Sequence, residues 1–80
     1  MSNYFDDERG YIEVYDLEDN RMGYLRTLDY STLEYVLTDD LDYAKRYIQE
    51  DLIYHDVIIL QGYCNRKGCV FVPKLPFSTF

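Results

Sequence analysis

The sequence predicts a small α+β domain, in which an antiparallel sheet of four to five strands carries one helix on one face, in the order β-β-(β)-α-β-β. The chain has 80 residues, enough for one domain, and its hydrophobic fraction of 48% with ten tyrosines is too apolar for a disordered acidic chain. Short β-type runs towards both ends flank a segment with helical spacing. We therefore expect a single domain over residues 1–80, with less regular termini at 1–9 and 73–80.

Two strands and a turn are predicted near the N-terminus. Residues 11–15 (Tyr-Ile-Glu-Val-Tyr) alternate in the manner typical of a strand. Residues 16–23 are polar and end in glycine, so we expect the chain to reverse there and residues 24–28 to pair back as a second strand. Residues 33–37 predict a third strand, although residues 31–34 (Ser-Thr-Leu-Glu) also fit a helix capping box.

The segment from Thr38 to Ile53 predicts the helix. Thr38 or Asp39 can cap its first amides, and the aspartates that follow complement the positive end of the helix dipole. One face repeats apolar residues, namely Leu41, Ala44, Ile48 and Leu52. A second stripe consists of tyrosines that either cover the edge of the core or form a contact surface: Tyr43, Tyr47 and Tyr54.

The last third of the chain predicts two further strands. Residues 56–63 contain four consecutive aliphatic side chains, which favours a strand buried at the centre of the sheet. Residues 70–72 would return antiparallel to it across a loop at 65–68. Pro73 and Pro76 then end regular structure, and the apolar tail at 74–80 either packs on the domain or docks on a partner.

The sequence contains no motif for catalysis or for binding a cofactor or metal. Cys64 and Cys69 flank the predicted loop, where reduced thiols are favoured over a disulfide or a zinc site, although their redox state stays open. His55 is expected to be satisfied or exposed, and the acidic residues 16–20 lack the glutamate that completes a calcium loop. We expect a protein that is not an enzyme, with no catalytic residue, metal site or cofactor.

Charge is distributed unevenly along the chain. The formal net charge is −7, and residues 1–44 hold twelve carboxylates against three arginines, a net of −9, whereas residues 45–80 carry a net of +2. A strongly acidic protein does not bind nucleic-acid phosphates directly. No apolar run is long enough to cross a bilayer and the N-terminal residues do not resemble a secretion signal, so we expect a cytoplasmic protein without membrane contact.

The negative side of the molecule is the best candidate for a working surface. Alternate residues of a strand lie about 6.8 Å apart on one face, so spaced carboxylates can occupy a channel that is built for DNA phosphates. Exposed tyrosines would supply desolvated anchors. The predicted partner-binding residues are Asp6, Asp7, Glu8, Asp16, Glu18, Asp19, Asp39, Asp40, Asp42, Tyr43 and Tyr47.

A short N-terminal hairpin, the segment Val36-Leu37-Thr38-Asp39-Asp40-Leu41-Asp42-Tyr43-Ala44-Lys45-Arg46-Tyr47 and a following hydrophobic strand together resemble small phage-encoded α+β proteins, some of them anti-CRISPR proteins. The resemblance covers about residues 11 to 63. It implies a non-catalytic inhibitor that occupies a surface of a Cas effector complex, often its DNA-binding channel, and acts in the host cytoplasm.

Two alternatives to this function remain open. The protein could be an immunity or antitoxin protein that neutralises a basic nuclease, because the acidic surface suits either partner. It could also be a small adaptor that assembles with itself through its aromatic residues, and homodimerisation therefore stays open as well. In each of these cases the partner is a protein rather than a nucleic acid.

Overall fold

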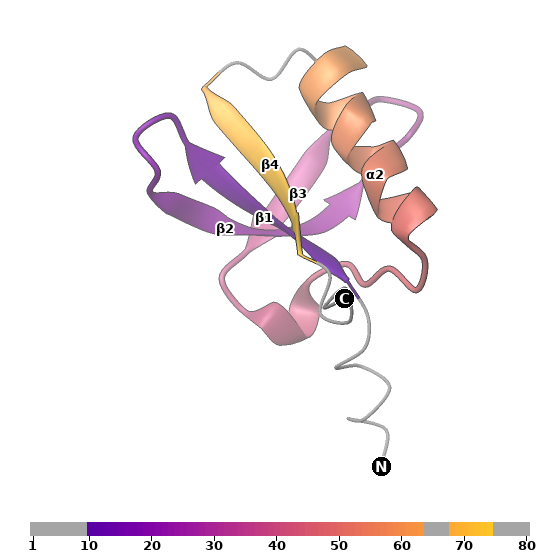
Figure 1. The fold of residues 1–80 in the computed structure, drawn as a ribbon, viewed down its shortest axis with the longest axis horizontal. Helices are drawn as coiled ribbons and strands as arrows, with labels where there is room; N and C mark the ends of the chain where they lie inside the picture. Colours follow the sequence, from indigo (N-terminus) through magenta and orange to yellow (C-terminus); the bar gives the residue numbers. More distant parts are fainter. Residues whose placement is uncertain (1–9, 64–67, 75–80) are drawn as a thin grey trace.

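The computed structural model describes residues 10–63 and 68–74, which form a four-stranded antiparallel sheet with one α-helix on one face (Figure 1). The strands lie in the order β3-β2-β1-β4. This architecture confirms the predicted α+β fold, with four strands. No helix within the described ranges is long and apolar enough to cross a membrane.

Strand β1 (Tyr11–Asp16) lies at the centre of the sheet and confirms the first predicted strand. Successive side chains of β1 point to opposite faces of the sheet. Ile12 and Val14 are fully buried beneath the helix, whereas Glu13 lies on the opposite face. β4 (Cys69–Lys74) pairs with β1 along its whole length, from Tyr11 opposite Lys74 to Asp16 opposite Cys69.

Strand β2 (Arg21–Leu28) follows a tight turn and pairs with the other edge of β1. Gly23 has φ +148, and a Cβ at this position would lie 3.0 Å from the carbonyl oxygen of Thr38 on β3 (Tyr35–Thr38). Glycine therefore permits the close approach of the two strands. The predicted third strand is present but begins at Tyr35, and residues 31–34 form a loop rather than a capped helix.

The predicted helix at 38–53 is wrong. Thr38 belongs to β3, and Asp40 caps a single 3₁₀ turn, η1 (Leu41–Tyr43). The next residues are held by the sheet, because the Lys45 amide donates to the Leu25 carbonyl and Tyr47 exchanges two backbone hydrogen bonds with Gly10. These long-range bonds use the amides that a helix would need.

The α-helix α2 (Glu50–Ile58) begins after this extended segment, and the predicted apolar face does not form. Ala44 is buried, but Ile48 and Leu52 are exposed. The predicted tyrosine stripe does not form either, because only Tyr54 lies in α2.

The predicted strand at 56–63 is also wrong. Residues 56–58 belong to α2, and residues Ile59–Tyr63 continue as the wider turn η2. Ile53, Val57 and Leu60 face the sheet at helical spacing, whereas Ile58 of the same aliphatic run is 59% exposed, as expected for a helix with one buried side. Residues 70–72 do form a strand, but it pairs with β1 and not with 56–63.

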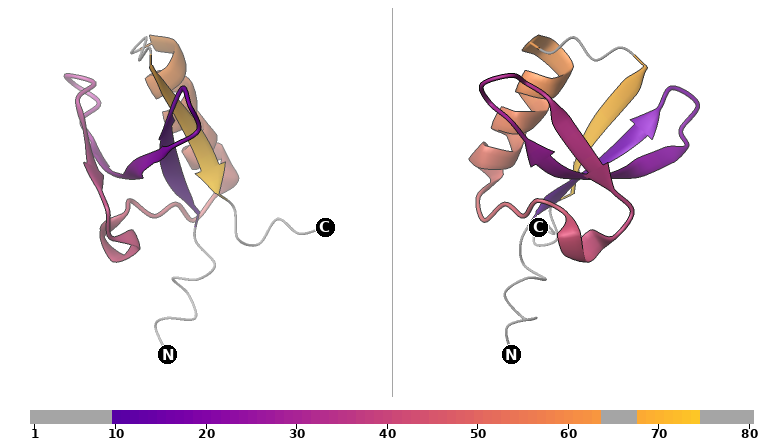
Figure 2. Two further views of the ribbon diagram at one scale, coloured as in Figure 1. Left: turned by 90° about the vertical axis from the view of Figure 1, so that its left-hand side faces the viewer. Right: turned by 180° about the vertical axis from the view of Figure 1, so that it is seen from behind.

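The hydrophobic core lies between the sheet and α2, and Figure 2 shows α2 lying along one face of the sheet. Side chains from every layer contribute to it: Ile12, Val14, Leu25, Leu28, Tyr47, Ile53, Leu60 and Phe71. The helix packs mainly against β1 and β4, which leaves the opposite face of the sheet without a helix.

Candidate functional site

The exposed carboxylates predicted to bind a partner lie in two loops, one after β1 and one after β3. β1 and β3 both run antiparallel to β2, so β1, which ends at Asp16, and β3, which ends at Thr38, point the same way along the sheet. The twist of the sheet places the β1–β2 turn at the upper left of Figure 1 and η1 at the bottom of the fold. The β1–β2 turn presents Glu18 and Asp19, and the β3–η1 connection presents Asp39, Asp40 and Asp42. We call these five exposed residues the acidic end.

Hydrogen bonds fix the backbone of both loops. Asp16, which is half-buried, accepts the amides of Glu18 and Asn20, each at 2.9 Å. The hydrogen bond from the Asn20 amide is the main reason that the pKa of Asp16 lies below its usual value. Asp40 accepts the amide of Asp42 at 2.9 Å and thereby closes η1. The backbone that carries the charges of the acidic end is therefore held in a defined conformation.

The predicted tyrosines divide into one exposed and one buried residue. Tyr43 is 58% exposed next to Asp42, and the guanidinium of Arg26 lies 5.0 Å from the centre of its ring. Tyr47 is only 4% exposed, so its prediction as a contact anchor is corrected. Its hydroxyl is needed inside the fold. Three other predicted residues lie outside the described ranges, namely Asp6, Asp7 and Glu8.

Positive charge gathers on the helix-free face of the sheet. The Arg46 guanidinium lies 5.4 Å from the ring centre of Tyr11, and that of Arg21 lies 5.1 Å from the ring centre of Tyr24. Lys74 lies 3.7 Å from the carboxylate of Glu13, which is almost fully buried in this face. The described part of the molecule therefore gathers cations and aromatic rings on this face, while Arg21 directly follows the β1–β2 turn and Arg26 lies on the ring of Tyr43 next to the acidic end.

Neither a protein-family model, nor a curated protein sequence, nor a solved structure matches this chain.

A second candidate site surrounds Asp56, a residue of α2 whose side chain is directed into the molecule. The side chain of Asp56 is 1% exposed and accepts hydrogen bonds from two tyrosine hydroxyls: Tyr47 donates to Oδ2, and Tyr30 lies 2.8 and 2.9 Å from the two oxygens. Nδ1 of His55 lies 3.1 Å from Oδ1. These contacts compensate a carboxylate that burial would otherwise destabilise strongly.

The environment of Asp56 changes the acidity of its tyrosine partners. Burial, followed by the hydrogen bond to Asp56, raises the pKa of Tyr30 to about 12. The same two causes raise the pKa of Tyr47, which lies deeper. Both tyrosines therefore remain protonated donors at neutral pH and keep the carboxylate satisfied.

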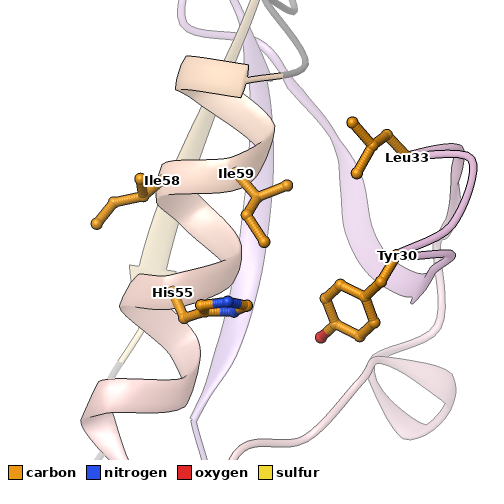
Figure 3. Close-up of a pocket in the computed structure, with 5 residues that line it drawn as sticks. All are labelled: Tyr30, Leu33, His55, Ile58 and Ile59. Atoms are coloured by element: carbon orange, nitrogen blue, oxygen red, sulfur yellow. The ribbon is translucent and has the colours of Figure 1, made fainter.

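A cavity of about 620 Å³ opens beside this hydrogen-bond network. Its lining residues are Tyr30, Leu33, His55, Ile58 and Ile59 (Figure 3). His55 and Ile59 extend from the helix towards Tyr30 and Leu33, which come from the β2–β3 loop. Leu33 has φ 65, a left-handed conformation that is rare for a leucine and often occurs at binding sites.

The sequence interpretation missed this second site. His55 is exposed, as expected, but the sequence did not link it to Tyr30 or identify Asp56 as buried. One available signal was the aspartate immediately before the aliphatic run at 57–60, because a residue that is buried with such a run needs hydrogen-bond partners whether the run is helix or strand. No cluster of three potential metal ligands occurs among residues 10–63 and 68–74.

Proposed function

We propose that the protein is a non-catalytic inhibitor, and that its acidic end binds the basic nucleic-acid-binding groove of a Cas effector complex and blocks DNA binding. The observation that carries the proposal is the position of Glu18, Asp19, Asp39, Asp40 and Asp42 in two ordered loops that follow β1 and β3. The choice of a Cas effector follows the resemblance to small phage proteins.

The separation of charge supports this mode of binding. A basic groove attracts the acidic end and repels the helix-free face, where Arg21, Arg46 and Lys74 lie. Such a field orients the molecule before contact and increases the association rate. Tyr43 lies beside the carboxylates, and its exposed ring supplies apolar contact area at the centre of the interface.

The acidic end also suits competition with DNA. Duplex DNA presents about one negative charge per 1.7 Å of its axis, and proteins bind it by aligning lysines and arginines with these charges. Carboxylates on a folded scaffold engage the same cations without the entropy cost of ordering a flexible chain. Bound inhibitor therefore excludes DNA directly, and no chemical step is required.

A DNA-displacement assay tests the proposal. Fluorescent target DNA is bound to each of a panel of purified Cas effector complexes, and its anisotropy is followed as the protein is added. We expect displacement from at least one complex, and inhibition that weakens as salt is raised from about 0.1 M to about 0.5 M, where exposed charges are screened. DNA that stays bound to every complex contradicts the proposal.

Two matched variants locate the surface. Asp39→Asn, Asp40→Asn and Asp42→Asn together remove three charges from the acidic end, and asparagine still caps η1 at position 40. Glu34→Gln, Glu50→Gln and Asp51→Asn remove three exposed charges elsewhere. We expect the first variant to inhibit at least about tenfold more weakly and the second to stay within about threefold of the wild type.

A further inference from the structure

The cavity beside Asp56 has the size and lining of a small-molecule site. Its volume of about 620 Å³ lies within the range of roughly 300–1,000 Å³ that is usual for ligand pockets. Leu33, Ile58 and Ile59 supply hydrocarbon walls from two separate segments of the chain. An apolar molecule that enters between the helix and the β2–β3 loop would be in contact with both.

One end of this cavity is polar and carries potential positive charge. Nδ1 of His55 lies 3.1 Å from Asp56, and the described residues offer no hydrogen-bond partner for Nε2. When the ring is protonated it forms an ion pair with the Asp56 carboxylate, and its Nε2–H is left to face a ligand. Lys45 does not line the cavity but places a second cation near it, with Nζ 5.9 Å from the ring centre of Tyr30 and 5.4 Å from that of Tyr47. An anionic group is therefore complementary to this end.

Asp56 itself is not available to a ligand. Its two oxygens already accept from Tyr30, Tyr47 and His55, and its side chain is 1% exposed. Its role is to orient the two residues that face the cavity. The polar atom left for a ligand is Nε2 of His55, whose ring Figure 3 shows extending towards Tyr30.

The walls are also fixed before any ligand binds. The Tyr30–Asp56 hydrogen bonds tie the β2–β3 loop to α2, and Leu33 is held in a left-handed conformation by the bond from its amide to the Asp29 carbonyl. Ile59 begins the widened helical turn η2, a type of distortion that frequently marks functional sites. A preformed cavity lowers the entropy cost of binding.

We propose that this cavity binds a small apolar carboxylic acid, with its carboxylate at Nε2 of His55 and its hydrocarbon part against Leu33, Ile58 and Ile59. The proposal is independent of the acidic end, because the cavity uses none of its five carboxylates. Binding there gives the protein a second ligand of a different chemical class.

The test uses octanoate as the probe and octanamide as its uncharged counterpart. His55 is the only histidine in the chain, so its ring resonances in an NMR titration report on this one position. At about pH 6 we expect octanoate to shift these resonances saturably with a Kd below about 1 mM, and octanamide to bind at least about tenfold more weakly. Equal binding of both probes, or no saturation, overturns the proposal.

Three variants assign the contacts, with binding followed by calorimetry. His55→Gln removes the imidazole and is expected to reduce octanoate affinity about tenfold while octanamide affinity changes little. Ile59→Ser places a hydroxyl in the wall and weakens both probes, whereas Ile48→Ser alters an exposed isoleucine outside the cavity and changes neither. If Ile48→Ser and Ile59→Ser behave alike, the probes bind elsewhere and the assignment is wrong.

Discussion

Asp56 is the residue that joins the three segments around the helix. Its carboxylate accepts hydrogen bonds from the hydroxyl of Tyr30 in the β2–β3 loop and from that of Tyr47 in the extended segment before α2. The ring of His55, from the same helix, also contacts it. A buried carboxylate is unfavourable unless all of these donors are in place, so the network selects one arrangement of the segments. Two of these partners, Tyr30 and His55, also line the cavity.

Removing the carboxylate tests this role. We expect Asp56→Ala to lower the free energy of unfolding by about 3 kcal/mol, because it leaves the buried Tyr47 hydroxyl without its acceptor. Asp51→Ala, at an exposed position of the same helix, is expected to cost less than about 1 kcal/mol. Urea denaturation measures both values. Similar losses in the two variants would contradict a structural role for Asp56.

The tyrosine partners of Asp56 predict a loss of stability at alkaline pH. The folded pKa of Tyr30 is about 12, above the ordinary value of 10.0, so between these values the unfolded chain releases a proton that the folded protein keeps. The stabilisation is therefore complete below about pH 10 and is lost as pH rises towards 12. Tyr47 contributes in the same direction because burial raises its pKa.

A single substitution isolates the part due to Tyr30. We expect Tyr30→Phe to be less stable than the wild type at about pH 8, and to lose less stability between about pH 8 and about pH 11, because the group that titrates is gone. Tyr54→Phe, at an exposed site on α2, should follow the wild-type curve. Parallel pH curves for wild type and Tyr30→Phe would show that Tyr30 does not make this contribution.

At the scale of elements, the accuracy of the sequence prediction depends on where the determining contacts lie. The β1–β2 hairpin is predicted to within a few residues, because strand alternation and the polar turn are both local signals. The helix is misplaced because Lys45 and Tyr47 bond to Leu25 and Gly10, which are distant in the chain. Helical spacing alone carries no information about such bonds.

The aliphatic run at 57–60 illustrates a second limit. A short apolar run fits a buried strand and the buried side of a helix equally well. The helix forms because Ile53, Asp56 and Leu60 then face inward together. In the helix the Asp56 carboxylate also reaches its hydrogen-bond donors, whereas a strand at this position would need other donors for it. The site around Asp56 was missed because this residue was assigned to a strand and not to the helix in which it lies.

Two isoleucines distinguish the observed helix from the predicted one. Ile53 is fully buried and Ile48 is 63% exposed, whereas a helix over 38–53 would place Ile48 in its apolar face. We expect Ile53→Ala to cost about 3 kcal/mol of unfolding free energy and Ile48→Ala less than about 0.5 kcal/mol, as measured by urea denaturation. A larger cost for Ile48→Ala would support the helix predicted from the sequence.

At the scale of the whole molecule, the central feature is the separation of charge. The sequence predicts a negative side, since twelve of the fifteen acidic residues precede residue 45. It does not predict the basic face, because Arg21, Arg46 and Lys74 come from three parts of the chain and meet only through the sheet register. It also could not separate Tyr43 from Tyr47, whose exposures are set by tertiary contacts.

The most direct test of the proposed function is a quantitative pull-down from bacterial lysate with three baits: the wild type, the Asp39/Asp40/Asp42 asparagine variant and the matched Glu34/Glu50/Asp51 variant. We predict that the wild type and the matched variant capture a basic nucleic-acid-binding complex, which is identified by mass spectrometry. This complex is released at about 0.5 M salt, and the asparagine variant captures less of it. A partner that survives high salt and binds all three baits equally, or recovery of only further copies of the protein, would contradict the account.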